Sequence, residues 1–154
     1  MATIAVGSDH AGYALKEQLA GELRDLGHEV LDLGAHSSER VDYPDFGAAV
    51  GRAVVGGDAE LGLCACGSGI GIAMAANKVP GVRAATVHDV TSARLTRQHN
   101  DANVICLGER LIGPEVASEA LRAWLDAEFE GGRHTGRIDK LSGLDGSLDR
   151  YAAD

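Results

Sequence analysis

Short apolar runs alternate along the chain with longer segments in which apolar residues recur every three or four positions. The short runs predict strands at 3–8, 29–33, 61–66, 84–87 and 104–107. The run 61–66, LGLCAC, is apolar on both faces, as in a strand that is covered on both sides. The longer segments predict helices at 13–26, 44–56, 71–78, 89–98 and from 114 to the stop at 131–132.

The order strand, helix repeats five times, which favours a parallel sheet with helices on both faces. We therefore predict an α/β fold, a Rossmann-like three-layer α/β/α sandwich with a five-stranded parallel sheet and a C-terminal helical tail. Residues 1–154 are expected to form a single domain. In the tail, 138–154, the residues Leu141, Leu144, Leu148 and Tyr151 recur at helical spacing, which predicts a segment for docking on another subunit.

Composition and charge exclude several classes of partner. The 154 residues carry a net charge of -9, which argues against nonspecific binding to nucleic acid or to an anionic membrane surface. No apolar run approaches the roughly 18 residues of a membrane span, and the N-terminus lacks the pattern of a signal peptide. The three cysteines, Cys64, Cys66 and Cys106, lie in apolar, strand-like segments. We expect free thiols and a cytoplasmic protein.

In sheets of this class the ligand lies at the carboxyl ends of the strands, which draws attention to residues 8–12, 66–71, 88–89 and 108–110. The segment 66–71, CGSGIG, places a cysteine at the end of a strand, followed by glycines and a helix start. Such a start offers free N–H groups to an anion and favours a thiolate. Ile72 stands where a dinucleotide motif needs glycine and where a cysteine phosphatase needs arginine, and no Walker lysine is present. The interpretation that remains is a reactive Cys66 beside an anion-binding loop. The alternative is a buried, unreactive cysteine in a glycine turn.

Other candidates are less specific. Asp9 and His10 follow the first strand, although Asp9 could simply cap the next helix. His99 and Asn100 follow the fourth helix, where a surface histidine and a helix cap are common. Three arginines stand out in an acidic chain because guanidinium groups bind phosphate well, and they are Arg110, Arg133 and Arg137. The alternative is a solvated basic patch.

Six motifs together resemble the ribose-5-phosphate isomerase B family, within a wider group that includes the galactose-6-phosphate isomerase subunits. They are GSDHAG at 7–12, SSERVDYP at 37–44, CGSGIG at 66–71, AANK at 75–78, RQHNDAN at 97–103 and EGGRH at 130–134. The resemblance spans nearly the whole chain in order. It implies a Rossmann-like fold, no metal and no cofactor. It also implies a homodimer or a dimer of dimers whose sites are shared between subunits.

The resemblance further implies a role for each matching residue. Cys66 would be the base that moves the proton, Ser68 would shuttle protons, and His99, assisted by Asp9, would open the sugar ring. The residues implied to contact the sugar or its enediolate are Asp9, His10, Tyr43, Gly67, Ser68, Gly69, Ile70, Gly71 and Asn100. Those implied to hold the phosphate are Arg110, Arg133, His134 and Arg137. Ser68 replaces the threonine of some members, and Ile72 stands where a branch without the cysteine has glutamate.

The activity implied is the interconversion of ribose 5-phosphate and ribulose 5-phosphate, with a small phosphorylated sugar as the only partner besides the chain itself. Three alternatives remain. The substrate could be another sugar phosphate, such as allose or galactose 6-phosphate or a tetrulose phosphate. Cys66, His99 and Asp89 could form a cysteine hydrolase. The chain could also bind a sugar phosphate without turning it over.

Overall fold

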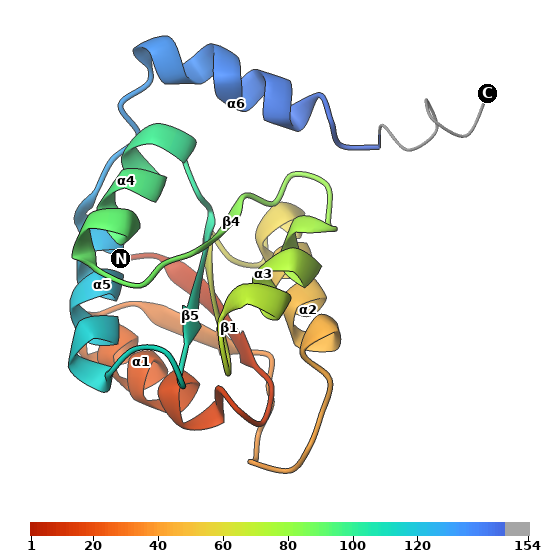
Figure 1. Cartoon of the computed structure of the whole chain (residues 1–154), viewed down its shortest axis with the longest axis vertical. Helices are drawn as coiled ribbons and strands as arrows, with labels where there is room; N and C mark the ends of the chain where they lie inside the picture. The colour runs from red at the N-terminus through yellow and green to blue at the C-terminus, as the bar shows by residue number, and fades with distance from the viewer. Residues whose placement is uncertain (147–154) are drawn as a thin grey trace.

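The computed structural model describes residues 1–146, which form a five-stranded sheet between two layers of helices (Figure 1). The elements are β1 (Thr3–Ser8), α1 (Tyr13–Asp25), β2 (Glu29–Asp32), α2 (Tyr43–Gly56), β3 (Leu61–Cys66), α3 (Ile70–Asn77), β4 (Ala84–Thr86), α4 (Val90–Asn100), β5 (Val104–Gly108), α5 (Pro114–Asp126), a 3-10 turn (Gly132–His134) and α6 (Thr135–Ser142). All strand pairs are parallel, in the order β2-β1-β3-β5-β4. The predicted α/β sandwich is confirmed.

Alternate residues of each central strand enter two different cores, because successive side chains of a strand point to opposite faces. In β3, Leu63 and Ala65 pack with the apolar stripes of α1, α4 and α5, where Trp124 is buried. Cys64 and Cys66 point to the other face, against α2 and α3. Figure 1 shows the same two layers, with α1, α4 and α5 on one side of the sheet and α2 and α3 on the other. Both faces of β3 are therefore apolar, as its sequence predicts.

The largest departure from the sequence prediction lies after α5. That helix ends at Asp126, not at Gly131-Gly132, because Ala127 takes an extended conformation with ψ 145°. The amide of Glu130 then donates to the carbonyl of Gln98 at the end of α4, at 3.0 Å. The segment 127–131 therefore runs beside the end of α4 instead of extending α5.

The tail forms the short helix α6, at the far end of the molecule from the carboxyl ends of the strands (Figure 1). No residue of α6 is buried, and Leu141 and Leu144 are 47% and 63% exposed. Leu148 and Tyr151, the other members of the predicted stripe, lie outside the described residues. Docking on another subunit stays a prediction. Within residues 1–146, no helix is both long enough and apolar enough to cross a membrane.

A fully buried lysine ties the end of β2 to the body of the protein. The Nζ atom of Lys16 donates to both carboxylate oxygens of Asp32, at 2.8 and 2.9 Å, and to the carbonyl of Ala35, at 2.7 Å. It also lies 3.0 Å from Glu17, whose side chain is 48% exposed. Burial opposes ionisation of Asp32, but the bonds from Lys16 and the Gly34 amide outweigh it and lower the pKa of Asp32. This contact holds the segment that leads from β2 to α2.

Replacing Lys16 with methionine is expected to lower the free energy of unfolding by about 3–5 kcal/mol, the usual cost of removing one partner of a buried pair. Urea denaturation at neutral pH measures it. Because the pKa of Asp32 is lowered, the pair stabilises the fold above the ordinary value of 3.8 and stops doing so as the pH falls through the folded value. Glu17→Gln is the control, with an expected cost below about 1 kcal/mol. Equal losses in the two variants would contradict the assignment.

Candidate active site

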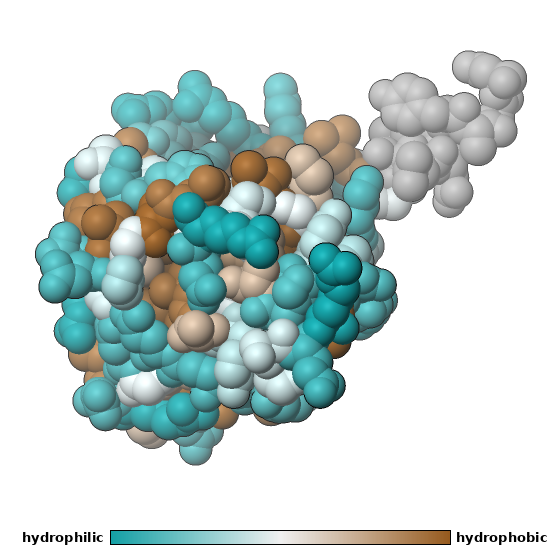
Figure 2. All heavy atoms as spheres, turned by 60° about the horizontal axis from the view of Figure 1, so that its bottom comes forward, coloured by the Kyte–Doolittle hydropathy of each residue, from teal (hydrophilic) through white to brown (hydrophobic). Residues whose placement is uncertain are grey.

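A pocket of about 560 Å³ opens where the chain order of the strands reverses. The strand β2 lies on one side of β1 and β3 on the other, so α1 and α2 leave for opposite faces of the sheet and a crevice forms between them. The pocket is lined by Asp9, His10, Ala11, Tyr43, Cys66, Gly67, Ser68, Ile70, Gly71, Arg110 and Leu111. Figure 2 brings this edge of the molecule forward and shows apolar patches interrupted by strongly hydrophilic side chains.

Cys66 is the one cysteine that reaches this pocket among the described residues. It is 4% exposed, and its Sγ accepts a hydrogen bond from the amide of Gly69 at 3.1 Å. Cys64 and Cys106 are fully buried behind it. The adjacent Cys64 thiol and burial raise the pKa of Cys106 well above 9.0, so that thiol stays protonated. The geometry thus places an amide donor on one thiol, Cys66, and leaves the other two in the core.

Two glycines allow the loop after Cys66 to pass close to the end of β5. Gly69 has a φ of +73°, and a Cβ there would lie 2.7 Å from the carbonyl carbon of Leu107. A Cβ on Gly108 would lie 2.5 Å from the backbone of Ser68. The Ser68 Oγ accepts the amide of Ile70 at 3.2 Å. An oxyanion beside Cys66 would therefore compete with Sγ for the Gly69 amide and with Ser68 for the Ile70 amide.

The other side of the pocket is formed by the turn after β1 and the start of α2. Asp9 is 6% exposed, and its Oδ1 accepts the amide of Gly12 at 3.0 Å, just before α1 begins. The Nδ1 atom of His10 lies 3.1 Å from the carbonyl of Val41 and 3.2 Å from its amide. Tyr43 packs over Gly71, where a Cβ would come within 2.7 Å of its ring. Asp9 therefore orders a turn while still lining the pocket.

Arg110 is the one predicted phosphate ligand that lies in this pocket. Its amide donates to the carbonyl of Gly67 at 3.0 Å, and its guanidinium covers Gly67, where a Cβ would lie 3.3 Å from Nη1. The arginine therefore brings a positive charge next to the loop that follows Cys66.

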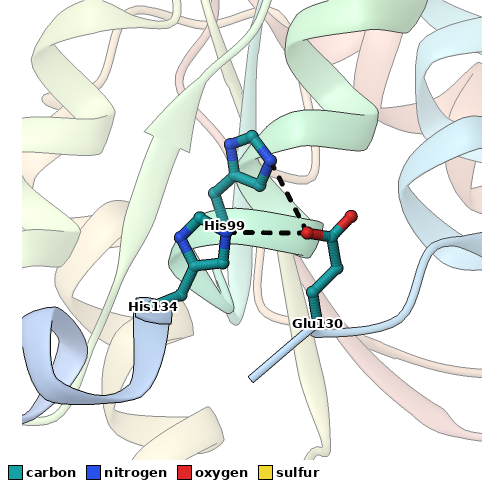
Figure 3. Close-up of side chains that lie close together, drawn as sticks. All are labelled: His99, Glu130 and His134. Carbon is teal, nitrogen blue, oxygen red and sulfur yellow. Dashed lines mark ion pairs between the residues drawn. The ribbon is translucent and has the colours of Figure 1, made fainter. Parts of the chain in front are cut away.

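The remaining candidates gather elsewhere, around the end of α4 and the 3-10 turn. The rings of His99 and His134 stack at 4.4 Å with an interplanar angle of 15°, and Glu130 lies beside both (Figure 3). Arg133 and Arg137 are exposed and form no ion pair with any residue in 1–146. Asn100 lines a separate cavity of about 440 Å³ between the body and α6.

The two groups lie at opposite edges of the sheet. Helix α4 starts after the carboxyl end of β4 and returns to the amino end of β5, so His99 lies near the edge where the strands begin. Cys66 lies where β3 ends. A single chain therefore does not bring His99, Asn100, Arg133, His134 and Arg137 to the pocket that holds Cys66. These residues were singled out by type and by motif, neither of which reports the edge of the sheet on which a residue lies.

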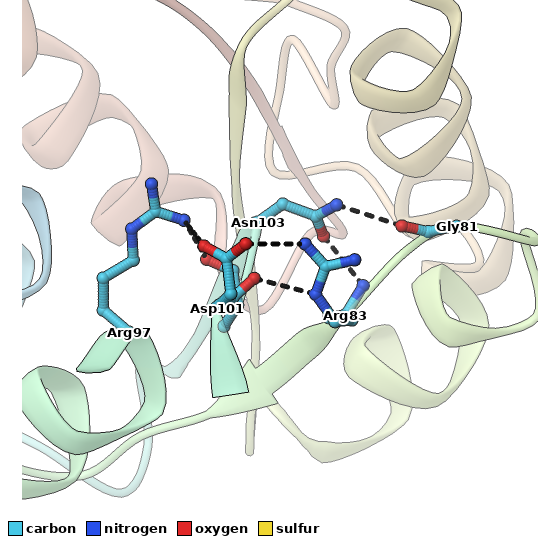
Figure 4. Close-up of polar contacts among 6 residues, drawn as sticks. Gly81, Arg83, Arg97, Asp101 and Asn103 are labelled. Carbon is cyan, nitrogen blue, oxygen red and sulfur yellow. Dashed lines mark hydrogen bonds and ion pairs between the residues drawn. The ribbon is translucent and has the colours of Figure 1, made fainter. Parts of the chain in front are cut away.

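An ion-pair network that sequence reasoning missed fixes the turn after α4 (Figure 4). Asp101 takes a left-handed conformation, with φ 45°, and ends the helix. Its carboxylate accepts from Arg97 at 2.9 Å and from Arg83 at 3.3 Å. Asn103 in turn bonds the backbone of Arg83 and of Gly81. Arg97, Asp101 and Asn103 thus hold in place the turn that presents His99.

The structure weakens the cysteine hydrolase alternative. Asp89 is the N-cap of α4, and its carboxylate accepts the amide of Ser92 at 2.6 Å, a bond that lowers the pKa of Asp89. His99 lies ten residues further along the same helix, about 15 Å away at 1.5 Å per residue. Asp89 therefore does not orient His99, as the third member of such a triad must.

Within residues 1–146, only His99, Glu130 and His134 place three metal-ligating atoms close together, within 4.8 Å of one another. Their arrangement does not suit an ion as it stands. A metal lies in the plane of each imidazole that binds it, and two nearly parallel rings do not aim at a common point. Sharing an ion would require one ring to turn.

An α/β protein with a thiol and an amide-rich loop at its switch point belongs to a broad class that binds small anionic ligands. Comparison with known proteins narrows the class. A family model described as Ribose/Galactose Isomerase matches residues 4–141, and the chain belongs to this family.

Several relatives match over nearly their whole length. The chain is 45% identical to ribose-5-phosphate isomerase B of Escherichia coli over 145 residues, covering 94% of this chain and 97% of that one. It is 43% identical to D-erythrulose-4-phosphate isomerase of Pectobacterium atrosepticum, covering 92% and 93%. The solved structure of ribose-5-phosphate isomerase B from Clostridium thermocellum superposes with a TM-score of 0.93 at 48% identity, covering 95% and 99%. The family resemblance read from the six motifs is confirmed.

Proposed function

We propose that the chain is an aldose–ketose isomerase that interconverts ribose 5-phosphate and ribulose 5-phosphate. The observation that carries the proposal is the Cys66 thiol, 3.1 Å from the Gly69 amide, in a pocket at the switch point of a chain of the Ribose/Galactose Isomerase family. A base next to an amide donor is what enediolate chemistry needs, because proton removal from carbon leaves negative charge on oxygen.

In the proposed mechanism the Cys66 thiolate removes the proton from C2 of the open-chain aldose. The electron pair moves into the bond between C1 and C2, and the charge on O1 is held by amides of the loop 67–71. Ser68, which lines the pocket, passes a proton between O2 and O1. Cys66 then returns its proton to C1, which leaves the ketone at C2.

The residues around the end of α4 and the 3-10 turn require a second copy of the chain to reach the pocket. We propose that the enzyme is a homodimer, or a dimer of dimers, in which His99, Asn100, Arg133, His134 and Arg137 of one subunit complete the pocket of the other. The separation of the two groups within one chain supports this, because a common site then requires two copies. The phosphate would lie between Arg110 and the two exposed arginines. A cytoplasmic location is part of the same proposal.

The experiment that tests the proposal is an assay of the purified protein with three aldose phosphates. We expect rapid turnover of ribose 5-phosphate without added metal, and slower turnover of a six-carbon and a four-carbon sugar phosphate. Faster turnover of either competitor would move the assignment to another isomerase of the family. Binding of all three without turnover would support a sensor instead.

A further inference from the structure

Among residues 1–146, Glu130 is the one acidic residue within ion-pair distance of His99, the expected ring-opening acid, and none of the roles discussed so far uses it. Its Oε2 lies 3.5 Å from Nε2 of His134 and 3.9 Å from Nε2 of His99, beside both rings (Figure 3). These are ion-pair distances to two imidazoles that come from different elements, α4 and the 3-10 turn. One carboxylate is thus within ion-pair distance of both rings.

The backbone holds Glu130 in this place. Its amide donates to the carbonyl of Gln98, the residue before His99, at 3.0 Å. The chain then turns through Gly131 and Gly132, both with positive φ, which brings His134 back over the same carboxylate. A positive φ favours glycine because it has no Cβ. The two glycines therefore lie in the turn that places His134 on His99, and not at the end of α5.

The stacked pair carries one proton more readily than two, since two positive rings 4.4 Å apart repel each other. His134 is 5% exposed, and its buried Nε2 has no hydrogen-bond partner within residues 1–146. Burial lowers the pKa of His134, as do the charges of His99, Arg133 and Arg137, while Glu130 opposes them. Burial therefore favours the neutral form of His134, and the Glu130 carboxylate stays within ion-pair distance of the more exposed ring of His99.

We propose that Glu130 is a positioning residue for ring opening, which stabilises the His99 imidazolium that donates the proton and keeps the His99 ring stacked on His134. The inference rests on the proposed function, because it assigns a task within that reaction. It concerns only the step that converts the cyclic sugar to the open chain and leaves the proton transfer by Cys66 untouched.

The step balances without any further reactant. Ribose 5-phosphate is mainly a furanose, in which O4 closes the ring on C1. The C1–O4 bond breaks, its electron pair goes to O4, and O4 takes a proton from the His99 imidazolium. The C1 hydroxyl loses its proton to the Asp9 carboxylate or to water as the aldehyde forms. The Glu130 carboxylate stabilises the imidazolium before the transfer.

The test separates ring opening from proton transfer at carbon. Ribulose 5-phosphate is acyclic, because its O5 carries the phosphate and leaves no hydroxyl to close a five- or six-membered ring. Exchange of its C1 hydrogen with deuterium from heavy water therefore reports the Cys66 step alone. Conversion of ribose 5-phosphate to the ketose requires both steps. Both are measured by NMR on the full-length protein and on two variants.

We expect Glu130→Gln to slow conversion of ribose 5-phosphate by about 10-fold, at the low end of a general acid's contribution, with exchange within about 2-fold of the wild type. Glu128→Gln is the matched control. This exposed residue lies two positions earlier on the same segment, forms no ion pair within residues 1–146, and should leave both rates unchanged. Thermal melting of the variants checks the fold.

Any other pattern overturns the proposal. Equal losses of conversion and exchange would make Glu130 a structural residue, and unchanged rates would give it no role. If the wild type neither converts ribose 5-phosphate nor exchanges the C1 hydrogen of the ketose, the proposed function itself fails, and that result is distinct from a failure of Glu130.

Discussion

Cys66→Ala is expected to lower the turnover of ribose 5-phosphate by about 10²–10⁴-fold, the usual contribution of a general base. The variant retains Arg110 and the loop 67–71, so substrate binding should change little and the loss should fall on kcat. The reason is geometric. Within residues 1–146, no other thiol reaches the pocket that Cys66 shares with the Gly69 amide. Steady-state kinetics at neutral pH measures the effect.

Cys64→Ala is the matched control for that change. Cys64 lies two residues earlier on β3, on the same face of the sheet, and is fully buried without lining the pocket. It should retain a kcat close to that of the wild type and lose some stability, because a buried side chain becomes smaller. Full activity in Cys66→Ala, or an equal loss in Cys64→Ala, would show that Cys66 is not the base.

Mixing two inactive variants is expected to restore activity. Cys66→Ala removes the base from the pocket, and His99→Asn removes the expected acid at the opposite edge of the sheet. If each site combines Cys66 of one subunit with His99 of its partner, a mixed dimer holds one doubly defective site and one intact site. Its turnover per dimer should reach about half that of the wild type.

The mixed dimer can be isolated by expressing the two variants together with different affinity tags and purifying over both. The two parent homodimers, handled in the same way, give the baseline. If sites lie within one chain, every site in the mixed dimer has one defect, and its activity will not exceed that of the more active parent. That outcome would rule out a site shared between two subunits.

Much of the fold can be predicted from local patterns in the sequence. The period of apolar residues separates strands from helices, and the two-sided apolar run 61–66 identifies the centre of the sheet. The glycines after Cys66 indicate a close backbone approach, and Gly69 and Gly108 do leave room where the loop meets the end of β5. The end of α5 does not follow from local rules, because the chain leaves the helix after Asp126 and pairs Glu130 with Gln98, far away in the sequence.

For the candidate site too, one part follows from the sequence and the other only from the tertiary structure. A strand, a cysteine, a glycine-rich loop and a helix are consecutive in the chain, so their spacing alone places Cys66 at the carboxyl edge of the sheet. The position of His99 depends on the direction of α4, which returns it to the amino edge, and the tertiary structure decides that separation. The buried contact of Lys16 with Asp32 and the placement of Glu130 beside two imidazoles likewise cannot be predicted from the sequence. Each joins residues from different elements, and only the packing of those elements brings them within reach.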